Sequence, residues 1–337
     1  METVWGHQLE CLGWSKHTKD IFISSLAKST RKGYNNLLQK CKQFCEKHNV
    51  QYPPVSSEIL AEFLHTLSEE SKRPSSVLHS AIAALSHVYT ALELQDITKH
   101  DYIKRLVTGL IKTKTLYPMK KSSVMPIQNF TELFTAWGDN KFLSTKQLRL
   151  KTITLLALAF MLRPSDVAPK GTMYDSQTSC EQTLTFTTDK IQLCFDGVRI
   201  QFFGIKNDTS RSGFEVFVPS HKNVILDPKT TLQHYLERTD SVRTDGAVFL
   251  SLQRPYRALS ASSIAKILDD AIGLAGLSGQ GFSAKSFRPT GATCAIHQGV
   301  DPNIVQKIGR WKCQDVFFQH YVHSKTPVDF VSNLLVE

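Results

Sequence analysis

Residues 285–321, KSFRPTGATCAIHQGVDPNIVQKIGRWKCQDVFFQHY, decide the fold of the second half of the chain. Pro289 is tolerated only in the first turn of a helix, so a helix begins next to Arg288. Gly309 marks the end of another helix before Trp311. This stretch therefore predicts helices over 287–298, over 302–309 and around Tyr321.

The start of the first of these helices is a candidate anion site. The backbone N–H groups and the dipole at a helix N-terminus favour an anion, and the Arg288 guanidinium adds paired donors that match phosphate oxygens. Lys285 lies three residues earlier, and two cations without an acid between them are unfavourable unless an anion binds. Trp311 and Tyr321 stand among apolar residues, where core packing is the simplest interpretation.

The region upstream mixes helix and strand. Residues 151–162 (KTITLLALAFML) predict a core helix because they are apolar on all sides after the first residues. Alternating apolar residues on both sides of the Asp196-Gly197 turn predict a hairpin, and 214–218 predict a third strand. Further helices are expected over 228–238 and 262–274.

Two cations upstream are also candidates. Arg163 follows the core helix directly, and Pro164 forces a turn that places Asp166 where it can orient the arginine. The alternative is an Arg–Asp pair that only ties two helices together. Lys206 and Arg211 lie in the polar loop after the hairpin, where a solvated surface is the default and a lysine that swings into a ligand is the alternative.

The first third predicts a compact bundle of four amphipathic helices. They cover 29–48, about 57–67, 74–92 and 101–111. The helical spacing of apolar residues then ends, and a basic linker follows over 113–126. Its charge, with that of the preceding residue, is suited to a phosphate backbone or to an ordinary solvated loop; the lysines concerned are Lys112, Lys114, Lys120 and Lys121.

Composition bounds the function. The 337 residues suggest two domains, and 41% hydrophobic residues fit a globular chain. Forty Lys and Arg against 30 Asp and Glu give a net charge of +10, which favours a polyanionic partner. The seven cysteines are scattered without a CxxC pair, which indicates a reducing compartment. No nucleotide-binding glycine motif, metal-binding motif or transmembrane run is found, so we expect no metal and no cofactor.

Taken together, these residues resemble the catalytic set of the tyrosine recombinases, the phage-integrase family. That signature combines an Arg in an Arg-x-x-Asp/Glu context, a Lys on a hairpin turn, a His-x-x-Arg pair, a His or Trp after a Gly, and a nucleophilic Tyr. The wording GRWK and FQ-x-Y is most similar to the eukaryotic DIRS-like retrotransposons and cryptons. In chain order the set falls on Arg163 with Asp166, Lys206, Lys285, Arg288, Trp311 and Tyr321.

The resemblance implies a mainly α fold with a small antiparallel sheet (α+β). A helical core-binding domain (1–112) clamps DNA, and a catalytic domain (127–337) ends in a C-terminal helix. It also implies a site-specific recombinase or integrase of a mobile element that needs neither metal nor ATP. In it Tyr321 attacks the scissile phosphate to form a 3′-phosphotyrosyl link.

The resemblance further assigns roles to the other residues. The two arginines hold the phosphate, and Trp311 contacts it through the indole N–H. Lys206 donates the proton to the 5′-oxygen, because a lysine can release a proton where an arginine cannot. Double-stranded DNA is the expected partner, with a homodimer on each site, a tetramer in the synapse and a nuclear location.

Two departures from the family pattern leave alternatives open. Lys285 stands where the family has His, and the spacing from Trp311 to Tyr321 is longer than usual. A catalytically silent, DNA-binding descendant is one alternative, and strand relaxation like that of a type IB topoisomerase is another. A helical adaptor with a basic face would explain the composition but not the ordered motif. The apolar residues beyond Pro327 predict a terminal helix that docks on its own core or on a neighbouring protomer.

Overall fold

The computed structural model describes most of the chain and divides it into two compact units, Met1–Lys120 and Lys121–Glu337. The described residues are 13–114, 124–169, 172–175, 180–183, 186–206, 208, 212–244 and 246–321. The predicted terminal helix beyond Pro327, the lysines at 120 and 121, and Arg211 lie outside these ranges.

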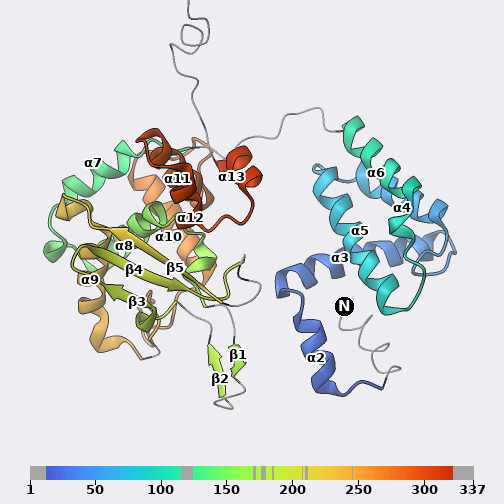
Figure 1. Cartoon of the computed structure of the whole chain (residues 1–337), viewed down its shortest axis with the longest axis horizontal. Helices are drawn as coiled ribbons and strands as arrows, with labels where there is room; N and C mark the ends of the chain where they lie inside the picture. Colours follow the sequence, from blue (N-terminus) through green and yellow to red (C-terminus); the bar gives the residue numbers. More distant parts are fainter. Residues whose placement is uncertain are drawn as a thin grey trace, which may run out of the picture. The chain divides into compact units, whose positions relative to one another are not determined.

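The first unit is entirely helical within its described residues (Figure 1). Ser56 begins one helix by accepting a hydrogen bond from the Glu58 N–H, and Pro74 occupies the first turn of the next, as predicted. One buried cluster, which includes Leu60, Leu64 and Val88, joins the helices. The helices are α2 (Lys16–Ser24), α3 (Lys28–Lys47), α4 (Ser57–Glu69), α5 (Pro74–Ala91) and α6 (Asp101–Lys114), with a 3₁₀ turn η1 (Ile97–Lys99) before α6.

Two features of this unit differ from the prediction. Helix α2 was not expected, because its apolar residues, Ile21, Phe22 and Ile23, are consecutive and show no helical period. Helix α6 continues to Lys114, so the first residues assigned to the linker are helical. The Lys114 ammonium contacts the Glu69 carboxylate on α4, which extends the packing of α6 by one turn beyond Ile111.

The second unit packs helices around the buried helix α8 (Thr145–Ala159), and α9 (Pro228–Thr239), α10 (Ala261–Leu274) and α11 (Phe287–His297) all contact it. Helix α8 begins six residues before the predicted start because Ser144 and Gln147 form a capping box. It ends earlier than predicted, because Met161 adopts a left-handed backbone conformation, φ 51°.

The small sheet of this unit is antiparallel, with strand order β3-β4-β5. Its strands are β3 (Ile191–Leu193), β4 (Gly197–Phe202) and β5 (Phe214–Pro219), so the predicted hairpin and third strand are confirmed. Ile200 pairs with both Ile191 and Val216, and the inward side chains of β4 join the core. A separate two-stranded ribbon, β1 (Thr172–Asp175) with β2 (Cys180–Thr183), was not predicted.

The remaining described elements of this unit are three further helices and several 3₁₀ turns. Helix α7 (Gln128–Trp137), also not predicted, packs Phe130 and Phe134 into the core. Helices α12 (Pro302–Gly309) and α13 (Gln314–Tyr321) follow α11 and gather beside it (Figure 1). The 3₁₀ turns are η2 (Asn140–Phe142), η3 (Pro164–Asp166), η4 (Thr188–Lys190), η5 (Val224–Leu226), η6 (Asp240–Val242) and η7 (Ala284–Ser286).

Helix α11 can approach α8 closely only because residue 291 is glycine. A Cβ at Gly291 would lie 2.3 Å from the carbonyl oxygen of Leu158, which belongs to the rigid backbone of α8. This approach brings Arg288, one turn earlier on α11, next to the C-terminal end of α8. The fold thus places two segments that are far apart in the sequence side by side.

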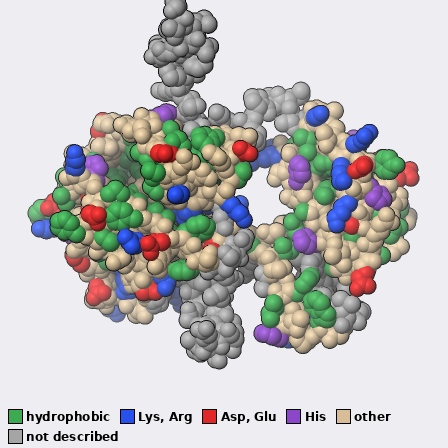
Figure 2. Space-filling model, in the orientation of Figure 1, with side chains coloured by type: hydrophobic (Ala, Val, Ile, Leu, Met, Phe, Trp, Pro, Cys, Tyr) green, Lys and Arg blue, Asp and Glu red, His purple; other side chains and the backbone are tan. Residues whose placement is uncertain are grey.

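No helix within the described ranges has the length and apolarity that are needed to cross a bilayer. On the face drawn in Figure 2, Lys and Arg side chains of both units are interspersed with acidic and neutral side chains.

Candidate active site

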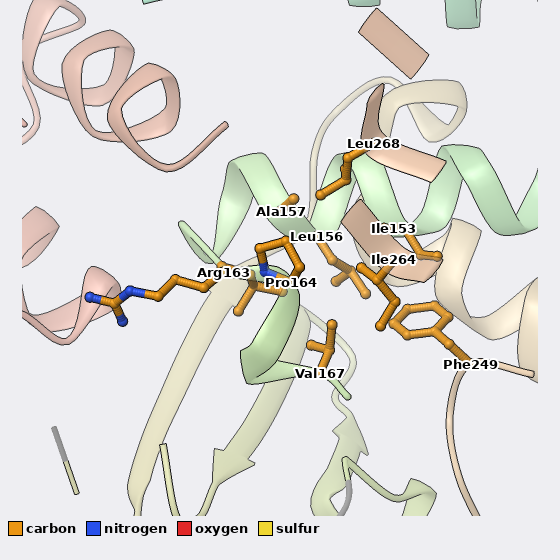
Figure 3. Close-up of a pocket in the computed structure, with 10 residues that line it drawn as sticks. Ile153, Leu156, Ala157, Arg163, Pro164, Val167, Phe249, Ile264 and Leu268 are labelled. Atoms are coloured by element: carbon orange, nitrogen blue, oxygen red, sulfur yellow. The ribbon is translucent and has the colours of Figure 1, made fainter. Parts of the chain in front are cut away.

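Arg163 occupies a fixed position just beyond the end of α8. Its backbone is extended (φ −90°, ψ 150°), the conformation that the following proline favours. The Asp166 carboxylate accepts a hydrogen bond from the Arg163 N–H at 2.9 Å. The Arg163 side chain is half-buried and extends away from the apolar residues of a small cavity, among them Leu156 and Val167 (Figure 3).

Arg288 is the second residue of α11 and is 3% exposed. Its two terminal nitrogens donate hydrogen bonds to the carbonyl oxygens of Met161 and Gly309. The guanidinium therefore joins the end of α8 to the end of α12. The prediction that Arg288 lies at a helix N-terminus is confirmed.

Two aromatic rings cover Arg288. The guanidinium carbon lies 3.9 Å from the ring centre of Trp311 and 5.6 Å from that of Tyr321. The rings of Trp311 and Tyr321 are 4.8 Å apart, and Phe317 packs on the other residues of this small cluster. Trp311 fits because residue 309 is glycine, since a Cβ there would lie 1.7 Å from the indole ring.

The electrostatics of this group favour an anion. Burial, together with the nearby charges of Arg163 and Arg310, lowers the pKa of Arg288 to about 9. Burial also lowers the pKa of Arg310 to about 10, while Asp166 opposes that shift. Three arginines thus influence one another around a single carboxylate, that of Asp166.

Buried donors of Arg288 and Trp311 have no hydrogen-bond partner among the described residues. They are the Nε–H of Arg288 and the indole Nε1–H of Trp311. A buried donor without an acceptor costs about 1–3 kcal/mol. An oxyanion that accepted a hydrogen bond from either donor would remove this cost and would offset the excess positive charge.

The structure does not bring every predicted residue into this group. Lys206 lies between β4 and β5, as predicted, and its side chain is exposed. Lys285 is exposed on η7 while the residues on either side of it, Ala284 and Ser286, are buried. No described contact joins either lysine to Arg288. The two cations at the start of α11 therefore differ, because one is buried and the other is solvated.

The loop that carries Lys206 is braced by Asp208, which the sequence analysis did not single out. Asp208 is 7% exposed, and its carboxylate accepts hydrogen bonds from the backbone N–H groups of Gly204 (2.9 Å) and Gly213 (3.2 Å). Both glycines have positive φ, which suits a tight turn. An Asp in a polar loop that has a glycine near each end was the available sequence signal.

Arg310 is the second residue that the sequence analysis missed. It stands in the quoted stretch as the residue between Gly309 and Trp311, and it forms a buried ion pair with Asp166. A charged residue at the end of an apolar helix was the available signal. The Asp166 carboxylate thus contacts the backbone N–H of Arg163 and the side-chain guanidinium of Arg310.

The predicted DNA-binding lysines that the structure describes lie in the first unit. Lys112 is exposed on α6, and Lys114 contacts Glu69. Within the described part of the chain, no group of three or more His, Cys, Asp or Glu side chains is arranged to hold a metal ion.

Comparison with known proteins identifies relatives of low sequence identity. No protein-family model matches the chain. An integrase/recombinase XerD homolog from Selenomonas ruminantium is 23% identical over 303 residues, which cover 88% of this chain and 82% of the relative.

Similar solved structures cover nearly the whole chain. The Tn1549 transposon integrase in complex with transposon right end DNA has a TM-score of 0.57 and 15% identity, over 98% of this chain and 96% of that one. XerH site-specific recombinase bound to its difH substrate has a TM-score of 0.56 and 14% identity, over 90% and 79%. A lambda integrase dimer bound to a core site has a TM-score of 0.55 and 13% identity, over 97% and 99%. These similarities confirm the expected fold class, and they support the resemblance to tyrosine recombinases.

Proposed function

We propose that this chain is a site-specific DNA recombinase or integrase that cuts and rejoins DNA through a covalent link to Tyr321. The observation that carries the proposal is the position of Tyr321 and Trp311 over the buried Arg288 guanidinium, at 5.6 Å and 3.9 Å. Nucleophile and cation come from different helices, and Arg163 influences the same guanidinium. Such a group suits one phosphate and a tyrosine that attacks it.

The reaction needs charge stabilisation and two proton transfers. In the proposed step the Tyr321 oxygen forms a bond to phosphorus, the bond from phosphorus to the 5′-oxygen breaks, and the DNA 3′ end stays on the tyrosine. Arg163 and Arg288 hold the two non-bridging oxygens, where negative charge increases in the transition state. The Trp311 indole N–H, which has no described acceptor, donates to the same phosphate.

The lysines act in the proton transfers. Lys206 donates a proton to the leaving 5′-oxygen, and its exposed loop allows it to approach a bound duplex. Lys285 contacts the phosphate or assists the loss of the Tyr321 proton. Attack by a different 5′-hydroxyl on the phosphotyrosine then rejoins the strands in a new order, and the covalent link conserves the energy of the broken bond.

The described relatives suggest how DNA is held. The lambda integrase structure is a dimer bound to a core site, and the Tn1549 transposon integrase is in complex with transposon right end DNA. We extend this to a homodimer on each site of a mobile element, two of which form a tetrameric synapse. The helical domain (1–112) clamps the duplex and the catalytic domain (127–337) carries the site. Lys112, Lys114, Lys120, Lys121 and Arg211 contribute to binding of the DNA backbone. We further propose a DIRS-like or crypton origin, from the wording GRWK and FQ-x-Y, and a nuclear location, from the family resemblance.

A nicked duplex that carries the recombination site tests the proposal, because the strand downstream of the cut diffuses away and the covalent complex accumulates. We expect the wild-type chain to form a protein–DNA adduct that survives denaturation, and Tyr321→Phe to bind DNA without forming one. Tyr256→Phe is the matched control, because it removes a hydroxyl from a tyrosine of the same unit outside the site. Adducts that survive in Tyr321→Phe would refute the nucleophile.

The same substrate separates the alternatives. Tight binding without any adduct in the wild-type chain would favour a catalytically silent DNA-binding protein. Relaxation of supercoiled plasmid by single protomers, without exchange between two sites, would favour topoisomerase-like activity. Adduct formation followed by strand exchange between two sites supports recombination.

A further inference from the structure

The ion pair between Arg310 and Asp166 is almost fully buried. The nitrogen–oxygen distance is 3.4 Å, and the two side chains are 0% and 1% exposed. Arg310 also donates to the carbonyl oxygen of Ile308 at 2.8 Å, and its guanidinium carbon lies 4.4 Å from the ring centre of Phe202. The two terminal nitrogens of Arg310 and one face of its guanidinium therefore contact the protein.

One oxygen of Asp166 connects two distant segments of the site. Oδ2 accepts the backbone N–H of Arg163 at 2.9 Å and the guanidinium of Arg310 at 3.4 Å. Arg163 lies at the end of α8, whereas Arg310 lies at the end of α12. The carboxylate thus connects the backbone of Arg163 to the side chain of Arg310, the residue that precedes Trp311.

The backbone at Arg310 also requires an anchor. Its φ of 59° lies in the left-handed region, where glycine is the usual residue at the end of a helix. The residues on both sides contact Arg288, since Gly309 accepts its hydrogen bond and Trp311 covers its face. A shift of residue 310 would therefore displace both contacts of Arg288 at once.

We propose that Arg310 is a positioning residue that acts through Asp166. The inference rests on the function proposed above, because it says how the site for the scissile phosphate is held in shape. Loss of the pair should let the α12 end, with Trp311, move relative to Arg163. A displacement of about 1 Å lowers the rate of a positioned reaction on the order of 100-fold.

A double-mutant cycle tests this inference. We expect Arg310→Met to lower single-turnover adduct formation on the order of 100-fold. Asp166→Asn keeps an acceptor for the Arg163 N–H but removes the charge, so it should also lower the rate. If the two residues act as one unit, the Arg310→Met/Asp166→Asn variant should be no slower than the Arg310→Met variant. If the loss of rate in the double variant is instead the product of the losses in the two single variants, the inference is overturned, because Arg310 then acts independently of Asp166.

The Trp311 indole N–H resonance supplies a readout that does not depend on activity. Trp311→Phe assigns the signal in the DNA-free protein, and Arg310→Met should shift it while Arg149→Met, the control at a half-buried arginine of the same unit, should not. A slowed Arg310→Met variant with an unshifted indole signal would overturn the positioning role. An inactive wild-type chain would refute the proposed function, whereas the indole signal would still test the pair.

The double variant, which removes both charges of the buried pair, keeps the inference testable if Arg310→Met does not fold. Arg310→Met alone leaves Asp166 charged and buried, and this variant can fail to fold, whereas the double variant buries no net charge. If only the double variant folds, it is compared with the wild-type chain. A shifted indole signal and a slower reaction support the inference, and an unchanged signal with an unchanged rate overturns it.

Discussion

Gly309→Ala is the sharpest perturbation of the proposed site, because it adds a single methyl group beneath Trp311. The new carbon would lie 1.7 Å from a ring carbon of the indole, whereas ordinary contact begins at 3.4 Å. The ring or the helix end must therefore move by about 1.7 Å. The φ of Gly309 lies outside the left-handed region, so alanine can adopt the helical backbone and the clash is the whole effect.

The expected magnitudes follow from that displacement. An overpacked core costs about 1–3 kcal/mol in the free energy of unfolding. A displaced Trp311 loses its position over Arg288, and cleavage should fall on the order of 100-fold, which corresponds to about 2.7 kcal/mol in the barrier. Unfolding by urea and single-turnover adduct formation on a nicked duplex measure the two quantities.

Two controls isolate the clash. Gly273→Ala, at the end of α10 in the same unit, places its carbon no closer than 3.4 Å to the Ser278 hydroxyl, so stability and rate should stay near wild type. In a Trp311→Ala background the clash is absent, and Gly309→Ala should change the rate less than about threefold. A Gly309→Ala variant with the wild-type rate and an unmoved indole signal would refute the reasoning.

Three further predictions concern other parts of the molecule. Asp208→Ala removes the acceptor for the Gly204 and Gly213 N–H groups, so Lys206 should lose its position and cleavage should fall about tenfold or more. A substrate with a 5′-bridging sulfur needs no proton on its leaving group and should restore the rate, and an unrestored rate would contradict this role. Burial lowers the pKa of Lys151, which donates to Asn140, to about 8. The unfolded chain therefore binds more protons between pH 8 and 10, and stability should rise over that window by up to about 3 kcal/mol more in the wild type than in Lys151→Met. Urea unfolding at pH 8 and pH 10 checks this. An equal change in the free energy of unfolding between the two pH values in both proteins would argue against it. DNA binding should weaken steeply with salt as counterions are released, and a flat response in a salt titration would count against the DNA interpretation of the +10 charge.

The sequence was most informative where local rules are strong. Pro289 placed Arg288 at a helix start, and Asp196-Gly197 between alternating apolar residues placed the β3–β4 hairpin, as the structure confirms. It was weaker at helix ends, because these depend on packing. Helix α6 continues to Lys114, which contacts Glu69, and α8 ends two residues before the left-handed Met161.

What the sequence by itself determined is the order of the cationic and aromatic residues and the elements that carry them, since turns, caps and periodicity act over short distances. Only the tertiary structure decided which of these residues meet. It buried Arg288 beneath Trp311 and Tyr321, left Lys285 in solvent, and joined Asp166 to Arg310 across 144 residues of chain. Those contacts depend on the close approach of α11 to α8 at Gly291, which no local pattern in the sequence specifies.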